Sequence, residues 1–122
     1  MKVRTLTQKI NQLIENKEFD LAFVLVKQHP HYHENYMFND AYATLLYCTN
    51  QFTEAKEIIS FNIKLICKQS ANIPALLSSY YLKSLCYLAE NNTVKSQDYL
   101  NKCLRLSENY PELHKQFQQL LR

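Results

Sequence analysis

The sequence predicts an all-α fold, and three observations support this prediction. Apolar residues recur at spacings of three and four along most of the 122-residue chain, which is the pattern of amphipathic helices. The chain contains no Gly, although the hairpins and bulges of β-rich folds use Gly heavily. The breaks in the pattern are short and contain Asn or Pro, so brief turns connect the helices.

The periodic segments predict seven helices. The first two follow apolar stripes at residues 6–14 and 19–26. The other five are expected at about residues 34–48, 53–68, 75–89, 94–106 and 111–122. The helices form pairs, because the turn inside each pair contains Asn whereas the link between pairs contains Pro. One domain of three helix pairs, at about 3–29, 34–69 and 74–107, is therefore expected, followed by a terminal helix at 111–122.

The turns inside the pairs share a pattern. Each carries an Asn, the residue other than Gly that best tolerates a left-handed backbone, at Asn16, Asn50 and Asn91. Phe19 and Ala22 follow the first turn, and Phe52 and Ala55 follow the second at an offset of 33 residues. The aromatic ring fills the gap between paired helices, and the small residue lets their backbones approach. Ser96 takes the small position after the third turn.

This pattern resembles the tetratricopeptide repeat (TPR), whose period is about 34 residues. The resemblance is carried by Phe19, Ala22, Ala43, Leu46, Phe52, Ala55, Ser84, Tyr87, Ser96, Leu100 and Cys103. The sequence departs from the family where Ile10 replaces a small residue and Thr93 replaces the aromatic, and where 41 residues separate Ala55 from Ser96. The resemblance implies a right-handed superhelical array of three antiparallel helix pairs and a capping helix.

The resemblance also implies a partner-binding surface, because TPR arrays bind partners on the concave face formed by the first helix of each pair. Carried over by position, the binding candidates are Asn11, Met37, Asp40, Thr44, Tyr47, Tyr81 and Leu88, with Arg4, Thr7, Ile14, Ser78 and Leu85 beside them. Packing in the core is the competing interpretation for Leu85 and Leu88. The composition of this set fits an apolar helix or an extended segment of another protein. The expected function is that of an adaptor, a chaperone or a subunit of a larger assembly.

An RNA- or ribosome-associated repeat protein is the alternative function. It rests on the net charge of +3, on dispersed Lys and Arg residues, and on four tyrosines that could stack on bases, Tyr80, Tyr81, Tyr87 and Tyr99. The basic residues are Lys2, Arg4, Lys9, Lys64, Lys68, Lys83, Lys95, Lys102, Arg105, Lys115 and Arg122. This alternative requires the basic side chains to converge on one face. A homodimer, in which a second copy fills the groove, is a third alternative.

Composition excludes several other classes. Without Gly, the chain has no Gly-rich phosphate loop or dinucleotide-binding fingerprint. No nucleophile is spaced to meet a His on a helix, so we predict no enzymatic activity and no cofactor. No run of 18 apolar residues predicts a membrane span, and the N-terminus lacks a signal-peptide core. The expected location is the cytoplasm, or the nucleus if the source is eukaryotic.

Histidines and cysteines were the remaining candidates for site chemistry. His29, His31 and His33 surround Pro30, and three imidazoles in five residues can chelate zinc or nickel. No fourth ligand has a fixed spacing, so we predict no metal site. The four cysteines form no C-x-x-C pair and fall within helical patterns, which predicts buried free thiols at Cys48, Cys67, Cys86 and Cys103.

Overall fold

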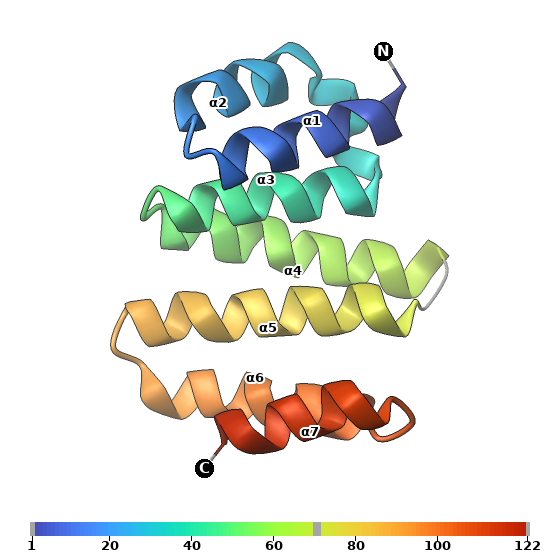
Figure 1. Cartoon of the computed structure of the whole chain (residues 1–122), viewed down its shortest axis with the longest axis vertical. Coiled ribbons are helices and arrows are strands. Elements are labelled where there is room, and N and C mark those ends of the chain that lie inside the picture. The colour runs from blue at the N-terminus through green and yellow to red at the C-terminus, as the bar shows by residue number, and fades with distance from the viewer. Residues whose placement is uncertain (1, 70–71, 122) are drawn as a thin grey trace.

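The computed structural model describes residues 2–69 and 72–121, and these ranges form an all-α structure without a strand. The elements are α1 (Val3–Glu15), α2 (Phe19–Gln28), a short 3₁₀ helix η1 (Pro30–Glu34), α3 (Tyr36–Cys48), α4 (Phe52–Gln69), α5 (Ile73–Ala89), α6 (Thr93–Leu106) and α7 (Pro111–Leu120), as Figure 1 shows. The predicted all-α class and the seven predicted α-helices are confirmed. Their predicted ends agree with the observed ones to within about two residues, except that α1 begins three residues before the predicted stripe.

The turns inside the three helix pairs have one backbone geometry. In each, a single residue has positive φ: 59° at Lys17, 63° at Asn50 and 63° at Asn91. The following N–H donates to a carbonyl five residues back, from Glu18 to Leu13 at 2.8 Å in the first turn. The second and third turns repeat this bond at 2.8 and 2.9 Å. All three turns are therefore Schellman caps, in which a left-handed residue ends the first helix.

The first turn corrects one prediction. Asn16 was expected in the left-handed position, but its φ is −84° and Lys17 occupies that position instead. Because α1 continues through Glu15, Asn16 is the C-cap, and the next residue must adopt the positive φ. The predictions for Asn50 and Asn91 are confirmed. Lys17 precedes Asn50 by 33 residues, so the left-handed positions keep the same offset as the aromatic and small residues.

Small side chains lie buried where paired helices meet. Ala22 and Ala55 have no exposed surface, and Ala43 is 1% exposed. In the third pair Ser84 and Ser96 replace alanines, and their hydroxyl oxygens lie 3.2 Å apart in a hydrogen bond that satisfies both buried groups. The small size of these five residues allows close packing within each pair.

The core consists of three clusters along the array. The first joins α1, α2 and α3 around Leu6, Ile10 and Leu45. The second joins α3, α4 and α5 around residues such as Leu46, Ile59 and Cys86. The third joins α5, α6 and α7 around Leu77, Cys103 and Phe117. Each cluster thus links one helix pair to the next helix, so α7 covers the last apolar face of the array.

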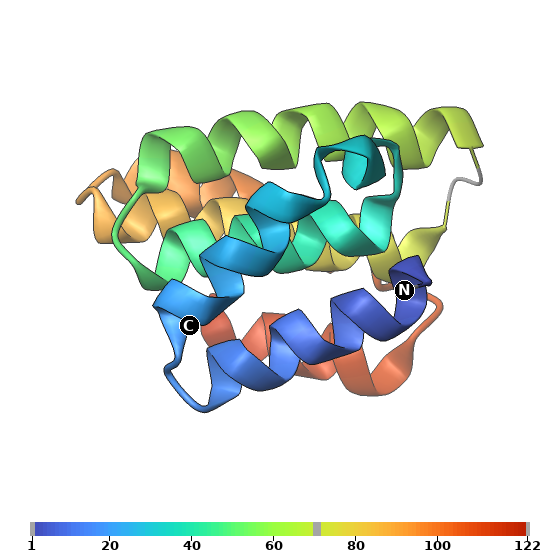
Figure 2. The ribbon, with the colours of Figure 1, turned by 90° about the horizontal axis from the view of Figure 1, so that it is seen from above.

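The first helices of the pairs lie on one side of the array. α3 packs against both α1 and α5, while α2, α4 and α6 pack beside their own partners. Figure 2 shows α1 and α7 on the same side of the molecule, with α3 and α5 set back between them and α4 on the opposite side. In Figure 1, α1, α3 and α5 follow one another along the long axis of the molecule.

The link between the first two pairs is more ordered than the linker predicted from Pro30. It forms η1, in which the His33 ring donates from Nδ1 to the Pro30 carbonyl at 2.8 Å. The Asn39 side chain donates to the His33 carbonyl, so η1 is tied to α3. Asn35 then caps α3, because its side chain accepts from the Phe38 N–H at 3.0 Å.

A buried polar pair joins α3 to α4. Asn39 and Asn62 are each 2% exposed, and Asn39 Nδ2 donates to Asn62 Oδ1 at 3.3 Å. Asn62 Nδ2 donates to the carbonyl of Tyr36 at 3.0 Å. These bonds connect the side chain of Asn62, on α4, to the first turn of α3. They hold α3 and α4 together beside the hollow between α1 and α5.

Only half of the cysteine prediction is confirmed. Cys86 and Cys103 are fully buried, and burial raises the thiol pKa to about 11 and about 12 respectively. Cys48 and Cys67 are exposed, because each lies in the last turns of its helix on the side away from the core. In the described part of the chain, no helix is long and apolar enough to cross a membrane.

Candidate functional site

A hollow between the first helices forms the first candidate site, which we call the α1–α5 groove. Its volume is about 380 Å³. It is lined by Arg4, Thr7, Gln8 and Asn11 of α1, Tyr36, Met37 and Asp40 of α3, Asn62 and Ile66 of α4, and Ala75 and Ser78 of α5. The predicted residues Asn11, Met37 and Asp40 therefore come together in one hollow.

The remaining predicted residues lie elsewhere. Tyr81 lines a second hollow of about 280 Å³ between α5 and α7, where its ring meets that of Phe117 edge-on at 5.9 Å. Thr44 donates its hydroxyl to the Asp40 carbonyl at 2.8 Å. Tyr47 packs on Phe52 at 5.7 Å, against the second core cluster.

Of the two leucines for which a core position was the competing interpretation, Leu85 packs against the second core cluster, and Leu88 is 51% exposed. Neither hollow is lined by Thr44, Tyr47, Leu85 or Leu88.

The lining of the α1–α5 groove carries one acidic side chain, Asp40, and one basic side chain, Arg4. The Asp40 carboxylate accepts a hydrogen bond from the Ser78 hydroxyl at 3.1 Å, which joins α3 to α5 across the groove. Burial raises the pKa of Asp40 above its ordinary value, and the Ser78 hydrogen bond opposes part of this rise. A desolvated carboxylate with one hydrogen bond retains acceptor capacity for a donor that enters the groove.

The contribution of α4 to this site was not predicted from the sequence. Asn62 and Ile66 belong to the second helix of their pair, and a repeat pattern assigns such residues to the core. They reach the groove because α4 crosses behind α3 and α5. No signal in the sequence separates Asn62 from an exposed Asn, since its partner Asn39 lies 23 residues away.

A second candidate site lies on α4, α5 and α6. We call it the Lys–Tyr surface, and it consists of Lys56, Lys83, Lys95, Lys102, Tyr80, Tyr87 and Tyr99. The rings of Tyr87 and Tyr99 stack at 5.6 Å with an interplanar angle of 18°. The Tyr80 ring lies 6.0 Å from that of Tyr99. Three tyrosines thus form a continuous aromatic base beneath the lysines.

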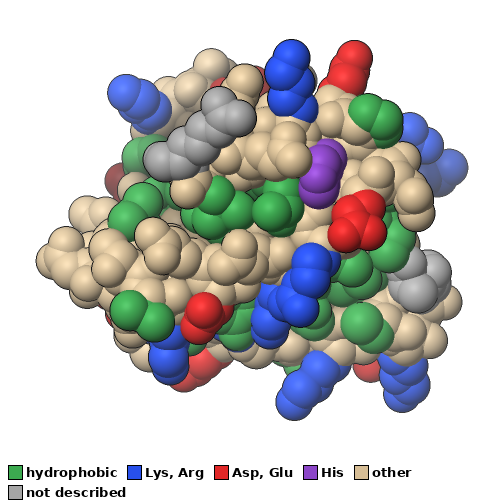
Figure 3. Space-filling view, turned by 90° about the horizontal axis from the view of Figure 1, so that it is seen from below, with side chains coloured by type: hydrophobic (Ala, Val, Ile, Leu, Met, Phe, Trp, Pro, Cys, Tyr) green, Lys and Arg blue, Asp and Glu red, His purple; other side chains and the backbone are tan. Residues whose placement is uncertain are grey.

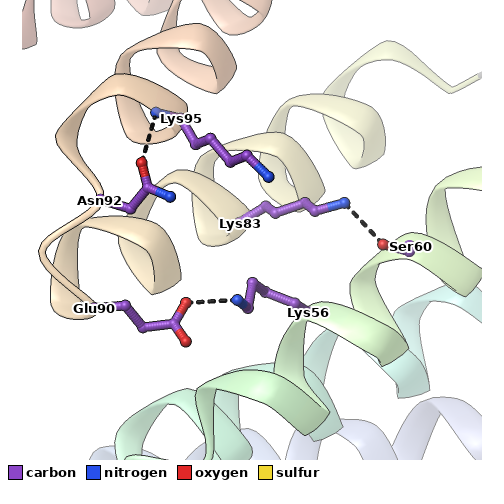
Figure 4. Close-up of polar contacts among 6 residues, drawn as sticks. All are labelled: Lys56, Ser60, Lys83, Glu90, Asn92 and Lys95. Atoms are coloured by element: carbon purple, nitrogen blue, oxygen red, sulfur yellow. Dashed lines mark hydrogen bonds and ion pairs between the residues drawn. The ribbon is translucent and has the colours of Figure 1, made fainter.

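Two lysines approach the ring of Tyr87. The Nζ of Lys56 lies 4.6 Å from the ring centroid and that of Lys95 lies 5.4 Å away, within cation–π range. Lys56 also forms an ion pair with Glu90 at 2.6 Å, and this contact raises the lysine pKa. Figure 4 shows the Lys56–Glu90 pair and the extended side chain of Lys95, whose backbone N–H is capped by Asn92.

Two further lysines approach Tyr99. Lys102 Nζ lies 4.6 Å and Lys83 Nζ 4.9 Å from its ring centroid. Lys83 also donates to the Ser60 hydroxyl at 2.8 Å, which connects α5 to α4 (Figure 4). Within the described ranges, Lys83, Lys95 and Lys102 form no ion pair with a carboxylate. Their charge is therefore available to an anion.

Two open hollows flank the Lys–Tyr surface and share Tyr87. One, of about 680 Å³, is lined by residues of α5 and α6 that include Tyr99, Lys102 and Arg105. The other, of about 490 Å³, lies between α4 and α5 and includes Lys64. The convergence of basic residues that the RNA alternative requires is therefore met in part.

The convergence is incomplete. Tyr81 lies on the groove side of α5 rather than with the other three tyrosines, and Arg4 lines the α1–α5 groove. At the C-terminal end of the array, Figure 3 shows Lys and Arg side chains mixed with acidic and hydrophobic ones. The positive charge is thus concentrated on α4–α6 rather than spread over one whole face. Lys56 was not among the basic residues singled out from the sequence. Of the observed lysine–tyrosine contacts, one joins neighbours on a single helix, Tyr99 and Lys102, and the others cross between helices.

The histidine cluster is described only in part. The side chain of His31 lies outside the described residues, and His33 is engaged with the Pro30 carbonyl. Among the described side chains, no group of three or more His, Cys, Asp or Glu residues is arranged to hold a metal ion.

The described residues define the class of the molecule as all-α, with seven α-helices. Comparisons with known proteins add no narrower class: no family model matches the chain, and neither curated proteins nor solved structures give a match.

Proposed function

We propose that this protein is a protein–protein interaction module with a right-handed, TPR-like array, and that it binds one segment of a partner in the α1–α5 groove. The observation that carries this proposal is the groove itself, which is framed by the first helix of each pair. The three Schellman turns of equal geometry and the small residues buried inside each pair support the repeat architecture.

The lining of the groove indicates the chemistry of the partner segment. Met37 is 44% exposed and lies on the same wall as Asp40, and Ala75 adds apolar surface, whereas Ile66 is fully buried. An apolar side chain that packs on Met37 would be desolvated, and a donor beside it would reach the Asp40 carboxylate. This combination fits an amphipathic helix or an extended segment with one N–H or cationic group among apolar residues.

In this role the protein acts by binding rather than by catalysis, as an adaptor, a chaperone or a subunit of a larger assembly. We place this activity in the cytoplasm, or in the nucleus of a eukaryotic source, where Cys48 and Cys67 remain reduced.

Site-specific photo-crosslinking tests the proposal. A photoreactive phenylalanine analogue at Met37 would report on the groove, and the same analogue at Val24 provides the matched control, because Val24 of α2 is 48% exposed and lies outside the groove. We expect one defined protein from the native source to crosslink at Met37 and not at Val24, and Met37→Glu to weaken binding of that purified partner about tenfold or more.

Two outcomes would contradict the proposal. Equal crosslinking from both positions would indicate a nonspecific contact. Crosslinking of Met37 to a second copy of this chain, with a dimer in sedimentation analysis, would show that the groove serves self-association instead.

A further inference from the structure

The strongest unexplained feature of the molecule is the concentration of positive charge on α4–α6, on residues that the groove does not use. The Lys–Tyr surface and its two flanking hollows contain six basic side chains, Lys56, Lys64, Lys83, Lys95, Lys102 and Arg105. The acidic side chains there are Glu57, Glu90 and Asp98. The local excess is therefore three positive charges, as large as the net charge of the whole chain.

Three of the four lysines are held by tyrosine rings or a neutral acceptor, and the fourth, Lys56, pairs with Glu90. Lys95 and Lys102 contact the faces of tyrosines and have no ion pair within the described residues. Lys83 is fixed by Ser60, a neutral acceptor. In the close-up of Figure 4, Lys56, Lys83 and Lys95 extend from three helices into one region. Three of these four ammonium groups can thus donate hydrogen bonds to phosphate oxygens without the loss of an existing ion pair.

The tyrosines narrow the choice of anion. Tyr87 and Tyr99 line the larger hollow beside Lys95 and Lys102, so an aromatic surface borders the cationic one. An acidic peptide offers carboxylates but no regular π surface, and a duplex keeps its bases stacked inside. A single strand offers regularly spaced phosphates together with unpaired bases that can stack on tyrosine rings.

We propose that the Lys–Tyr surface is a binding site for single-stranded nucleic acid, in which the lysines leave the rings of Tyr87 and Tyr99 to contact phosphates, and bases stack on the ring faces that the lysines leave. The strand lies across α5, from the hollow that contains Lys64 to the one that contains Arg105, because both hollows share Tyr87. This site is separate from the α1–α5 groove, since no residue lines both.

Fluorescence anisotropy with fluorescein-labelled 20-nucleotide oligo(U) and oligo(dT), titrated over a range of salt concentrations, tests the proposal. We expect binding that weakens steeply with salt. Lys95→Gln/Lys102→Gln should weaken it about tenfold at low salt and reduce the slope of log affinity against log salt by about 1.4, because each phosphate contact on a single strand contributes about 0.7. Tighter binding of oligo(U) would identify RNA as the source of the strand, and tighter binding of oligo(dT) would identify DNA.

The matched control is Lys9→Gln/Lys27→Gln, which removes the same charge from exposed positions on α1 and α2. It should leave the affinity within about twofold. A further variant, Tyr99→Leu, should lower the affinity at least about fivefold if its ring stacks on a base. Circular dichroism establishes that each variant remains folded.

Several results would overturn the proposal. These are no binding of either strand at low salt, equal weakening by the control pair, or equal affinity for polyglutamate of similar length. The last result would make the surface a site for acidic proteins. If Tyr99→Leu binds as tightly as the wild type, and only the lysine variant has a smaller salt dependence, base stacking is excluded. The surface would then be a general polyanion site, and the nucleic-acid assignment would be rejected.

Discussion

The α1–α5 groove and the Lys–Tyr surface hold their polar groups in different ways. Beside the groove, Asn39 and Asn62 are fixed by hydrogen bonds to backbone or side-chain partners and are each 2% exposed. On the Lys–Tyr surface, half-exposed cations rest on aromatic rings. The buried asparagine side chains are part of the folded scaffold, whereas the lysine side chains can exchange a ring contact for a contact with a ligand.

The largest effect on stability is therefore expected beside the groove. Asn62→Leu leaves the Tyr36 carbonyl without its donor and Asn39 without one acceptor, so the free energy of unfolding should fall by about 2–3 kcal/mol. Urea denaturation followed by circular dichroism measures this loss. Asn11→Leu makes the same chemical change at an exposed groove position, and it should alter stability by less than about 0.5 kcal/mol. Equal losses from both variants would remove the distinction between the two kinds of polar group.

A smaller loss of stability is expected for variants of the Lys–Tyr surface. Lys95→Gln/Lys102→Gln removes ring contacts from half-exposed side chains, each worth about 0.5 kcal/mol, so the free energy of unfolding should fall by no more than about 1 kcal/mol. The same denaturation assay applies. A loss as large as that of Asn62→Leu would mean that these lysines belong to the scaffold rather than to a ligand site.

The smallest expected effect on stability is an increase, comes from Asp40, and depends on pH. Burial raises the pKa of Asp40 in the folded state above its unfolded value, so the folded state binds more protons in the interval between the two pKa values. Stability from this group is present below the unfolded pKa and is lost as the pH rises through the folded one. Asp40→Asn should thus increase the free energy of unfolding at pH 7 by up to about 1 kcal/mol, because it removes a desolvated charge.

This gain should decrease as the pH falls towards 4, where wild-type Asp40 becomes protonated. Thermal melts of the two proteins at pH 7 and pH 4 compare the stabilities. A destabilised Asp40→Asn protein at pH 7 would show instead that the Ser78 hydrogen bond outweighs the cost of burying the charge.

Helix order and helix ends were predictable because they depend on local signals. Apolar spacing, Asn turns and Pro links each act over a few residues, and Asn50 and Asn91 occupy the predicted left-handed positions. Lys17 was not predicted, because only the exact last residue of α1 decides which side chain follows the cap. The exposure of Cys48 and Cys67 was missed for a similar reason, since a helical pattern does not show how far the neighbouring helix covers the last turn.

The candidate sites were predictable only where the first helices of the pairs supply the residues. Asn11, Met37 and Asp40 could be placed from position in their helices, and the structure brings them together. Asn62 and Lys56 were not found, because they reach their sites across a helix–helix contact that no spacing encodes. Side chains from three helices converge only through helix packing, and the spacing of residues in the sequence does not specify that packing.

The three separate core clusters have a consequence for how the protein opens. Each cluster joins one helix pair to the next helix, so stability accumulates from neighbour to neighbour along the array, and local unfolding begins at an end. Opening of the N-terminal pair would remove α1, one wall of the α1–α5 groove, while α4, α5 and α6 stay packed. The groove would thus be assembled or dismantled by fraying of the chain's first residues, and the Lys–Tyr surface would persist through both states.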